Sequence, residues 1–568
     1  MNKLQLKYLI LCFLLLAAHE SAYSQYLTTK VNFQFENISA DQLFQKVEKT
    51  GEFKFSYTRN IIDANRRYSY SQGPCSLHQL LTRTLGAEYI FEEKGKYIIV
   101  KRNRIKKGEK ILDGYIGSEA GEPLKDVTVY SKRRLNSTQT SSLGYYRMKI
   151  RESDSITSLT LSKFNYIDTT ISIIQKVDSG ITDSIGFVDT IKVPFYHLKP
   201  LKKTYDRFSQ DLSSLIFKPR IEEKNVEDTL YRKLQIGFLP YLGTNRKLSP
   251  RVVNAFSLNL LGGLSFGNSQ LELAGIFNVN RSYVHGLQMA GLFNIAGKEI
   301  SGAQFAGVFN YNGSNVSGAQ FAGLFNLSEG TISGLQFAGL FNSNPSSAKG
   351  GQFAGLFNYS KGSRAFIQFA GLTNVSDSSN LQVAPFNFSH YTGFQLGVFN
   401  FTTDSSTTQL GILSFNSKGC HSLEFAYNSE RHAEIAFRTG NYTLFNLLMT
   451  TISTESNDTT EWSFGYGLGT SKYLFSKWLM SFEISSQQLV QGGSINSLNL
   501  NNRAILGVQY FITKKTSIYA GLSYNQSLSD NARLMDDYMS PTPSLFQDKY
   551  NNLFTNAWLG WKIGLRFF

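Results

Sequence analysis

The chain of 568 residues is long enough for several domains, because a domain usually holds about 100–200 residues. Only 17% of the residues are charged, whereas 14% are aromatic and 47 are Gly. This composition disfavours a disordered chain or a helical coiled coil and favours a β-rich protein in contact with a membrane. The net charge of +15 is spread along the sequence, which disfavours nucleic-acid binding and makes anionic lipid headgroups the expected counter-charge.

Residues 1–24 predict a secretory signal peptide. Two lysines precede the apolar run 8–18, and the small-x-small sequence at 22–24 is typical of a cleavage site. The remaining cysteines, Cys75 and Cys420, fall in different predicted domains, so we expect no disulfide framework. Because no other run of about 20 apolar residues occurs, a membrane-embedded form of this chain would have to be a closed β-barrel.

Residues 25–102 predict a small α+β domain. Capping boxes at 39–42 and 76–79 begin two amphipathic helices, each followed by a Gly, and a β-hairpin closes the domain. The element order, with the motifs at 37–40 and 80–86, resembles the short N-terminal domain (STN domain) shared by secretins and TonB-dependent transducers. This resemblance implies a docking module in the periplasm; an unrelated small α+β unit is the alternative.

Residues 111–197 predict a small β-sandwich of short strands between Gly and Pro turns. The motifs at 121–129 and 143–146 resemble the carboxypeptidase regulatory-like domain that often precedes outer-membrane barrels in one large group of Gram-negative bacteria. The pair Ser-Ser at 141–142 stands where the family usually has Thr-Asp. The basic stretch 101–110 between the two domains is expected to be a solvated linker, with contact to a polyanion as the alternative.

An internal repeat of 16 residues is the strongest pattern in the sequence. Its glycines are Gly275, Gly291, Gly307, Gly323, Gly339, Gly355 and Gly371, each within a heptad like Gln-Phe-Ala-Gly-Leu-Phe-Asn. Alternate residues of a strand face opposite sides, which separates the Phe side chains from the Gln and Asn side chains. Neither face is charged, and one motif spans about nine residues, the length of a tilted strand that crosses a bilayer.

These features predict a mainly β chain that ends in a transmembrane antiparallel β-barrel over 233–568 with roughly 20 strands, one strand and one turn for each repeat. The expected lumen-facing residues are Gln288, Gln304, Gln320, Gln336, Gln352, Gln368, Asn294, Asn310, Asn326, Asn342, Asn358 and Asn374. The expected lipid-facing residues are Phe305, Phe309, Phe321, Phe325, Phe337, Phe341, Phe353 and Phe357. The repeats occupy 271–416.

A parallel β-solenoid over 270–416 is the alternative, since strict periodicity suits it and an even hairpin loop would put Phe on alternating faces of a barrel. The region 421–568 favours the barrel, because strand patterns with aromatic ends continue there without the repeat. Its last strand, 557–568, resembles the signal by which outer-membrane proteins reach the barrel-assembly machinery, with Phe568 as the terminal aromatic residue. The repeats resemble the surface repeats of bacterial outer-surface proteins, a group without assigned chemistry.

Catalytic patterns are few. The sequence 263–267 matches the Gly-x-Ser-x-Gly nucleophile motif but lies in a Gly-rich β run, where the strand-to-helix turn that this motif needs is absent. The histidines show no metal-ligand spacing, so we expect no enzyme, no cofactor and no metal. A hydrolase that uses His421 or His432 on the barrel rim is the least favoured alternative.

The resemblances imply an outer-membrane protein with its N-terminal domains in the periplasm. The linker 198–232 is too short for a TonB-type plug, which favours a receptor or signal-transducing component over active uptake; a passive porin-like or structural surface barrel is the alternative. The expected partners are outer-membrane lipid and lipopolysaccharide, the barrel-assembly machinery, and an inner-membrane anti-sigma-type regulator or a TonB-like protein.

Overall fold

The structure is a computed structural model that describes residues 26–174, 190–192, 196–199, 217 and 220–568, with gaps at 59, 64, 87, 103–105, 107, 152, 154–155, 363–364, 418, 454–460, 492–494, 496–497, 531–542 and 552. The signal-peptide prediction and most of the predicted linker therefore lie outside the described residues. The chain is mainly β and divides into two compact units. The first contains residues up to Gly275 and Val279–Tyr283; the second contains Ile276–Asn278 and Val284–Phe568. Among the described residues, no helix is long and apolar enough to cross a bilayer.

The first unit begins with an α+β domain that contains the two predicted helices. Both capping boxes are present: Ser39 starts α2 (Ala40–Glu48) with Gln42, and Ser76 starts α3 (Leu77–Leu85) with Gln79. The strands are β1 (Lys30–Val31), β2 (Phe35–Ile38), β3 (Lys54–Ser56), β4 (Tyr68–Tyr70), β5 (Cys75–Ser76), β6 (Tyr89–Lys94) and β7 (Tyr97–Arg102), in sheets β3-β7-β6, β2-β4 and β1-β5. Helix faces bearing Leu43, Val47, Leu80 and Leu81 are buried against these sheets in one apolar core.

A two-sheet β-sandwich follows in the same unit. One sheet contains β11 (Tyr145–Arg151), β8 (Glu109–Ser118), β14 (Thr190–Lys192) and β15 (Tyr196–Leu198). The other contains β10 (Ser137–Gln139), β9 (Thr128–Tyr130), β12 (Ile156–Ser162) and β13 (Thr169–Ile174). Leu112, Ile116, Val129 and Leu159 meet between the sheets, as the alternation of apolar residues requires.

A polar and aromatic contact joins the α+β domain to this sandwich. The Arg147 guanidinium donates to the Tyr89 carbonyl at 3.2 Å, and the rings of His78 and Tyr145 lie 4.5 Å apart. The Tyr145 hydroxyl in turn donates to the Asp113 carboxylate at 3.1 Å. Burial, with a smaller contribution from the nearby Arg147 charge, lowers the pKa of His78 from 6.5 to about 4.

This contact should loosen in acid. The unfolded chain protonates His78 at a higher pH than the folded chain does, so the stabilisation from neutral His78 is complete above about pH 6.5 and is lost as the pH falls toward 4. The loss is up to about 3 kcal/mol. Amide hydrogen exchange in α3 of the whole protein should therefore accelerate between pH 7 and pH 5, after correction for intrinsic rates, and a His78→Gln variant should lack this acceleration. An equal pH response in the variant would contradict this assignment.

The first coils of a parallel β-solenoid complete the first unit. They consist of β16 (Leu230–Leu239), β17 (Leu242–Gly243), β18 (Val252–Asn259), β19 (Gly262–Ser265) and β20 (Gly267–Ala274), in which β16 pairs parallel to β18 and β18 to β20. The short helix α5 (Ile221–Asn225) and the 3₁₀ helix η2 (Arg246–Arg251) precede and interrupt these strands. Asn225 donates to Asp126 O at 2.6 Å and to Thr128 Oγ1 at 2.9 Å, which attaches the sandwich to the start of the solenoid.

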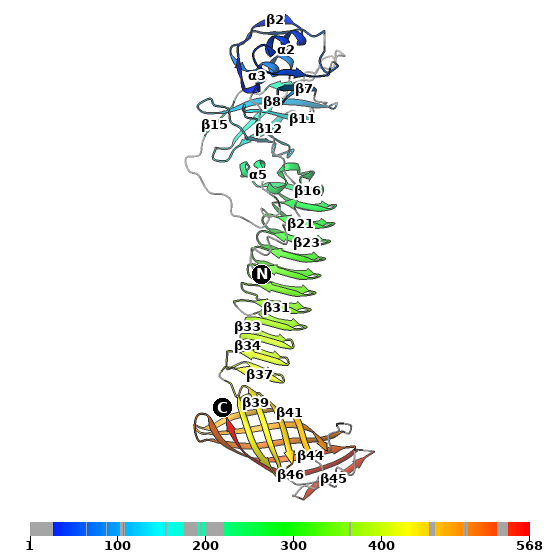
Figure 1. Cartoon of the computed structure of the whole chain (residues 1–568), viewed down its shortest axis with the longest axis vertical. Coiled ribbons are helices and arrows are strands. Elements are labelled where there is room, and N and C mark those ends of the chain that lie inside the picture. The colour runs from blue at the N-terminus through cyan, green and yellow to red at the C-terminus, as the bar shows by residue number, and fades with distance from the viewer. Residues whose placement is uncertain are drawn as a thin grey trace. The chain divides into compact units, whose positions relative to one another are not determined.

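The second unit contains the 16-residue repeats as solenoid coils. A typical coil has a seven-residue strand, a corner at Gly-Leu and a four-residue strand, as in β26 (Val316–Ala322) and β27 (Phe325–Ser328). The strands, stacked as in Figure 1, are β21 (Phe277–Asn280), β22 (Val284–Ala290), β23 (Phe293–Ala296), β24 (Ile300–Ala306), β25 (Phe309–Asn312), β26, β27, β28 (Ile332–Ala338), β29 (Phe341–Asn344), β30 (Gly351–Ala354), β31 (Phe357–Ser360), β32 (Ala365–Ala370), β33 (Thr373–Val383), β34 (Phe386–Leu396), β35 (Phe399–Thr402), β36 (Thr408–Leu410) and β37 (Leu413–Asn416).

The expectation that these repeats are strands of a barrel with roughly 20 strands is corrected here, and the solenoid alternative describes them. Gln304 pairs with Gln320 in parallel register, and Phe305 with Phe321, so each residue lies beside its equivalent in the next coil. The backbone turns at Gly323, which divides the expected nine-residue strand into two. Parallel register explains the invariant spacing, because identical side chains then form ladders along the solenoid.

An eight-stranded antiparallel barrel completes the second unit. Its strands are β38 (Ser422–Asn428), β39 (His432–Gly440), β40 (Phe445–Ser453), β41 (Glu461–Phe475), β42 (Trp478–Gln491), β43 (Asn499–Phe511), β44 (Thr516–Ser529) and β46 (Leu553–Phe567). Pairing of β38 with β46 closes the cylinder, and β45 (Ser544–Tyr550) pairs with β46 beyond the end of β38. The barrel is therefore much smaller than expected and is confined to the part of the chain without repeats.

Candidate functional site: the barrel and its solenoid

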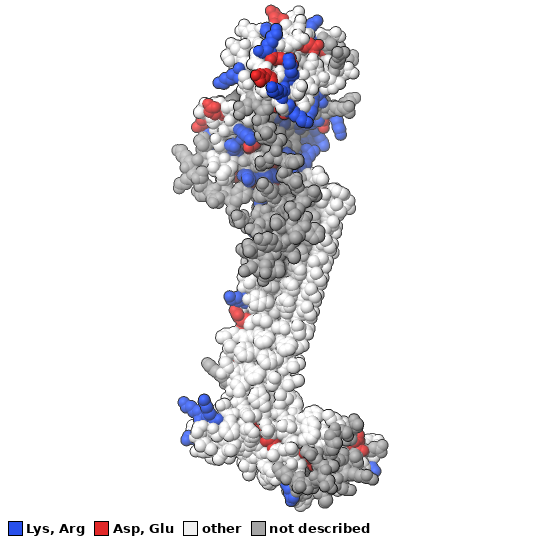
Figure 2. Space-filling view, viewed as in Figure 1, with Lys and Arg blue, Asp and Glu red and all other residues white. Residues whose placement is uncertain are grey.

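The strands of the barrel alternate between an apolar outer face and a polar inner face. On β46, Leu559, Trp561, Ile563, Leu565 and Phe567 are exposed, whereas the residues between them, including Lys562 and Arg566, are buried. The same alternation occurs on β42, where Phe482 and Ile484 are exposed on either side of buried Glu483, and on β38. Figure 2 shows few charged side chains on the visible face of the barrel. The barrel therefore has an apolar exterior and a charged interior.

Aromatic side chains gather near the barrel end at which β38 begins and β46 finishes. Trp478 lies 4.9 Å from Tyr510, and Phe511 lies 5.3 Å from Phe568, between ring centroids. The backbone amide of Phe568 donates to Lys515 O at 2.9 Å, so the terminal residue is fixed to the neighbouring turn. Phe568, the expected assembly residue, thus belongs to a cluster of aromatic side chains at this rim.

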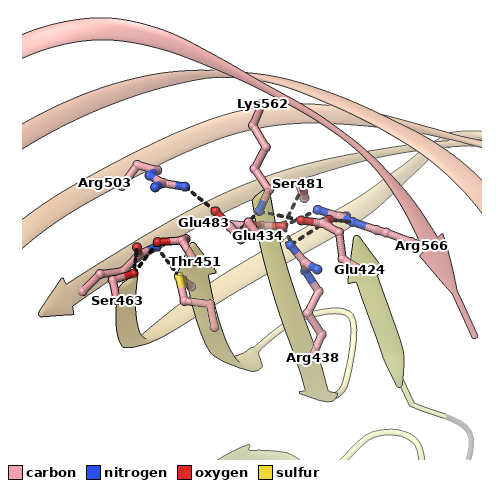
Figure 3. Close-up of polar contacts among 12 residues, drawn as sticks. Glu424, Glu434, Arg438, Thr451, Ser463, Ser481, Glu483, Arg503, Lys562 and Arg566 are labelled. Carbon is pink, nitrogen blue, oxygen red and sulfur yellow. Dashed lines mark hydrogen bonds and ion pairs between the residues drawn. The ribbon is translucent and has the colours of Figure 1, made fainter. Parts of the chain in front are cut away.

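The barrel interior is filled by an ion-pair network between distant strands (Figure 3). Glu424 contacts three cations: Arg438 at 3.0 Å, Lys562 at 2.5 Å, and Arg566. Glu483 lies 2.9 Å from Arg438 and 2.8 Å from Arg566. Each of these two arginines therefore bridges the carboxylates of Glu424 and Glu483.

A second group of ions lies further along the interior. Glu434 lies 2.7 Å from Arg503 and also contacts Lys562, and Arg503 lies 3.3 Å from Glu430. Four cationic side chains in the interior thus face four carboxylates, and all are nearly inaccessible to solvent. Eight strands enclose just enough room for side chains, so these residues occupy the space in which a wider barrel would hold water.

The expected lumen-facing residues are brought together, but inside the solenoid and not in a pore. Gln304, Gln320 and Gln336 are fully buried and form a ladder in which each side-chain amide donates to the preceding Gln at 2.6–2.8 Å. Gln288, Gln352 and Gln368 extend it. A second ladder connects Asn294, Asn310, Asn326, Asn342, Asn358 and Asn374, with successive distances of 2.9–3.0 Å.

The Phe side chains expected to face lipid instead form two stacked columns on the outside of the solenoid. Phe305, Phe321, Phe337 and Phe353 make one column, and Phe309, Phe325, Phe341 and Phe357 make the other. Neighbouring rings within a column are 4.7–5.1 Å apart and nearly parallel. Such stacking follows from the spacing of the parallel strands.

The Asn ladder should be intolerant of charge. Asn326 donates to Phe337 O at 2.8 Å and to Asn342 Oδ1 at 2.9 Å, and its own oxygen accepts from Asn310 at 2.9 Å. Asn326→Asp removes every hydrogen bond that the side-chain amide donates and buries a carboxylate, so we expect a loss of about 3 kcal/mol or more in the stability of the adjacent coils.

Hydrogen exchange over residues 316–344 measures this loss. The control is Asn315→Asp on an exposed corner, where the side-chain oxygen accepts from the Thr331 amide at 2.9 Å and a carboxylate keeps that bond. Equal protection in the two variants would contradict the role of the ladder.

The rim of the barrel caps the last coil of the solenoid within the second unit. The Ser414 amide donates to Thr439 Oγ1 at 3.1 Å and the Gly411 amide to Asn446 Oδ1 at 3.1 Å. The Tyr466 hydroxyl donates to Gly411 O at 3.1 Å. These bonds satisfy backbone groups that a free solenoid end would expose as an edge.

The candidate nucleophile and the two candidate histidines do not come together as a catalytic site. Ser265 is buried in β19, where its hydroxyl accepts from Asn280 at 2.7 Å. His421 contacts the Asn416 carbonyl beside the last coil, and His432 lies 3.9 Å from Glu461 inside the barrel.

Sequence reasoning missed the interior charges of the barrel. A signal for them is present in sequences such as Trp-Lys-Ile-Gly-Leu-Arg-Phe at 561–567, where cations alternate with large apolar residues. In a closed barrel with an apolar exterior, this alternation places the cations inside. Comparison with known proteins finds no matching family model, no matching curated protein and no matching solved structure.

Proposed function

We propose that this chain is an outer-membrane protein in which a closed eight-stranded barrel anchors a periplasmic solenoid, and that the domains before the solenoid dock a partner in the periplasm. The observation that carries the proposal is the alternation of the barrel strands, with exposed Leu, Ile and aromatic residues outside and paired charges inside. On β46, the apolar outer positions extend from Leu559 to Phe567, which matches the length of a tilted strand that crosses a bilayer.

The orientation follows from the connections between the strands. At the end joined to the solenoid, strands are linked by the short turns 441–444, 476–477 and 512–515. At the other end, the connection 429–431 is also short, but the connections 454–460, 492–498 and 530–543 are longer. Outer-membrane barrels have short turns toward the periplasm and long loops outside, so the solenoid is assigned to the periplasmic side.

A docking or signal-transmitting role fits this arrangement better than transport. The ion network occupies the interior of the barrel, which argues against a passive pore. The resemblances of 25–102 to an STN domain and of 111–197 to a carboxypeptidase regulatory-like domain support a docking role, with an anti-sigma-type regulator or TonB-like protein as the kind of partner.

Two measurements test the proposal. The mature protein should fractionate with the outer membrane and change its electrophoretic mobility on heating, as folded barrels do. In a planar bilayer it should give no stable conductance steps, and neither should a variant that lacks residues 25–232. Conductance steps in both proteins would establish a pore, and conductance steps only in the truncated protein would mean that the N-terminal domains close it. Recovery of the protein in the soluble fraction would overturn the membrane assignment.

A further inference from the structure

The corner between the two strands of each coil carries an exposed apolar residue. In the second unit, these corner residues form one column, Ile276, Leu292, Val308, Leu324, Leu340, Leu356, Leu372, Pro385, Val398 and Ile412. Of these, Leu292, Leu324, Leu340, Leu356, Leu372, Val398 and Ile412 have exposed fractions between 38% and 49%. Their equivalent positions are only about 4.8 Å apart from coil to coil, so the column is a continuous ridge.

The two Phe columns flank this ridge. One lies just before the corner, as at Phe321, and the other just after it, as at Phe325, and both are partly exposed. We call the ridge with its two flanking Phe columns the apolar edge. The charged residues described between 284 and 416 all lie outside it: Lys298, Glu299, Glu329, Lys349, Lys361, Asp377 and Asp404.

The area of the apolar edge is large for a surface left in water. At about 200 Å² for each large apolar side chain, roughly a third of it exposed, the edge presents about 1,000 Å². The largest apolar patch on a monomeric protein is typically about 300–600 Å². A stable interface covers about 800 Å² on each partner, so the apolar edge is large enough for one.

We infer that the apolar edge binds the apolar edge of a second copy of this chain. Side chains of the apolar edge repeat at the spacing of the coils, and a surface with the same repeat can pack its side chains between them over the whole length. A second copy of the chain has the same fold and therefore the same repeat. The lack of charge on the edge removes the repulsion that identical surfaces would otherwise experience.

The arrangement of the two copies follows from a shared membrane and so rests on the proposed function. Two barrels in one bilayer face the same way, which requires parallel solenoids related by a two-fold axis along their length. Each residue of the apolar edge then lies at the same height as its equivalent in the partner. An antiparallel pair would instead place Leu292 opposite Val398 and Leu340 opposite Leu356.

Cysteine cross-linking of the full mature protein in native membranes tests both statements. Leu292→Cys, Leu340→Cys and Leu372→Cys should each give a covalent dimer with a short thiol-reactive cross-linker. Lys298→Cys and Lys349→Cys, at exposed positions on the opposite corner, should give at least tenfold less. The native Cys75 and Cys420 are buried, so the unsubstituted protein provides the background. Cross-linking at Leu340 alone would overturn the parallel arrangement.

A second measurement separates failure of the interface from failure of the anchor. The unsubstituted protein in detergent should have the mass of two chains by light scattering, and Leu340→Glu combined with Leu356→Glu should reduce the dimer fraction at least tenfold. A monomeric mass for the unsubstituted protein, with normal outer-membrane fractionation, would overturn the dimer and leave the anchor intact. Fluorophores on Leu340→Cys that are quenched by spin-labelled lipid, in a monomeric protein, would assign the edge to lipid contact instead.

Discussion

Glu424→Gln should lower the free energy of unfolding of the barrel by about 3–5 kcal/mol. The carboxylate contacts Arg438, Lys562 and Arg566, which come from β39 and β46. Gln has the same shape but no charge, so it leaves three cations in a space from which water is excluded, with only part of their counter-charge. Removal of one member of a buried ion pair is costly because its partner remains buried and unpaired.

All four Trp residues lie in the barrel, at 462, 478, 558 and 561, so tryptophan fluorescence reports on the barrel alone. Urea unfolding in detergent micelles, followed by this signal, measures the effect. Lys472→Gln is the matched control because Lys472 is exposed near the rim and carries a charge outside the network. An equal, small change in both variants would show that the network adds little to the stability of the barrel.

Gly323→Ala should disrupt the solenoid while leaving the barrel intact. A Cβ atom at this position would lie 2.0 Å from the carbonyl oxygen of Gly307 in the preceding coil. The obstructing atom belongs to the backbone and cannot rotate away, so neighbouring coils must separate. We expect a loss of about 3 kcal/mol or more in local stability, at the upper end of the cost of overpacking.

Hydrogen exchange of the coils around 307–339, alongside tryptophan fluorescence of the barrel, measures the two effects separately. Ala319→Ser, on a half-buried outward position of β26, the strand that ends just before Gly323, is the control and should change exchange little. If Gly323→Ala behaved like the control, the close approach between coils, and the parallel register that produces it, would be contradicted.

Local features of the fold could be predicted from the sequence because they depend on neighbouring residues. The capping boxes at Ser39 and Ser76 satisfy backbone amides within one helical turn, and the structure confirms both helices. The repeat could also be found, and with it the separation of Phe from Gln and Asn. Whether neighbouring strands pair parallel or antiparallel could not be predicted, because alternation along a strand is the same in both kinds of sheet.

The features that could not be predicted from the sequence depend on contacts between residues far apart in the chain. Glu434 and Lys562 are 128 residues apart, and nothing in either local sequence identifies its partner. The expected nine-residue strand included Gly323, because a Gly within a strand pattern does not by itself reveal a turn. The need for Gly at this corner comes from the carbonyl of Gly307, one coil away, which leaves no room for a Cβ atom.

The cap that the barrel rim places on the last coil also bears on how the chain folds. A solenoid coil contacts only its neighbours, so the first coil to form has no template and is the most costly. The rim offers donors and acceptors at Thr439, Asn446 and Tyr466 that already match the edge of a coil. Once the barrel has folded, it can therefore serve as the nucleus for the coil that ends at Asn416, and the solenoid can then grow from its C-terminal end toward its N-terminal end, opposite to the direction of synthesis.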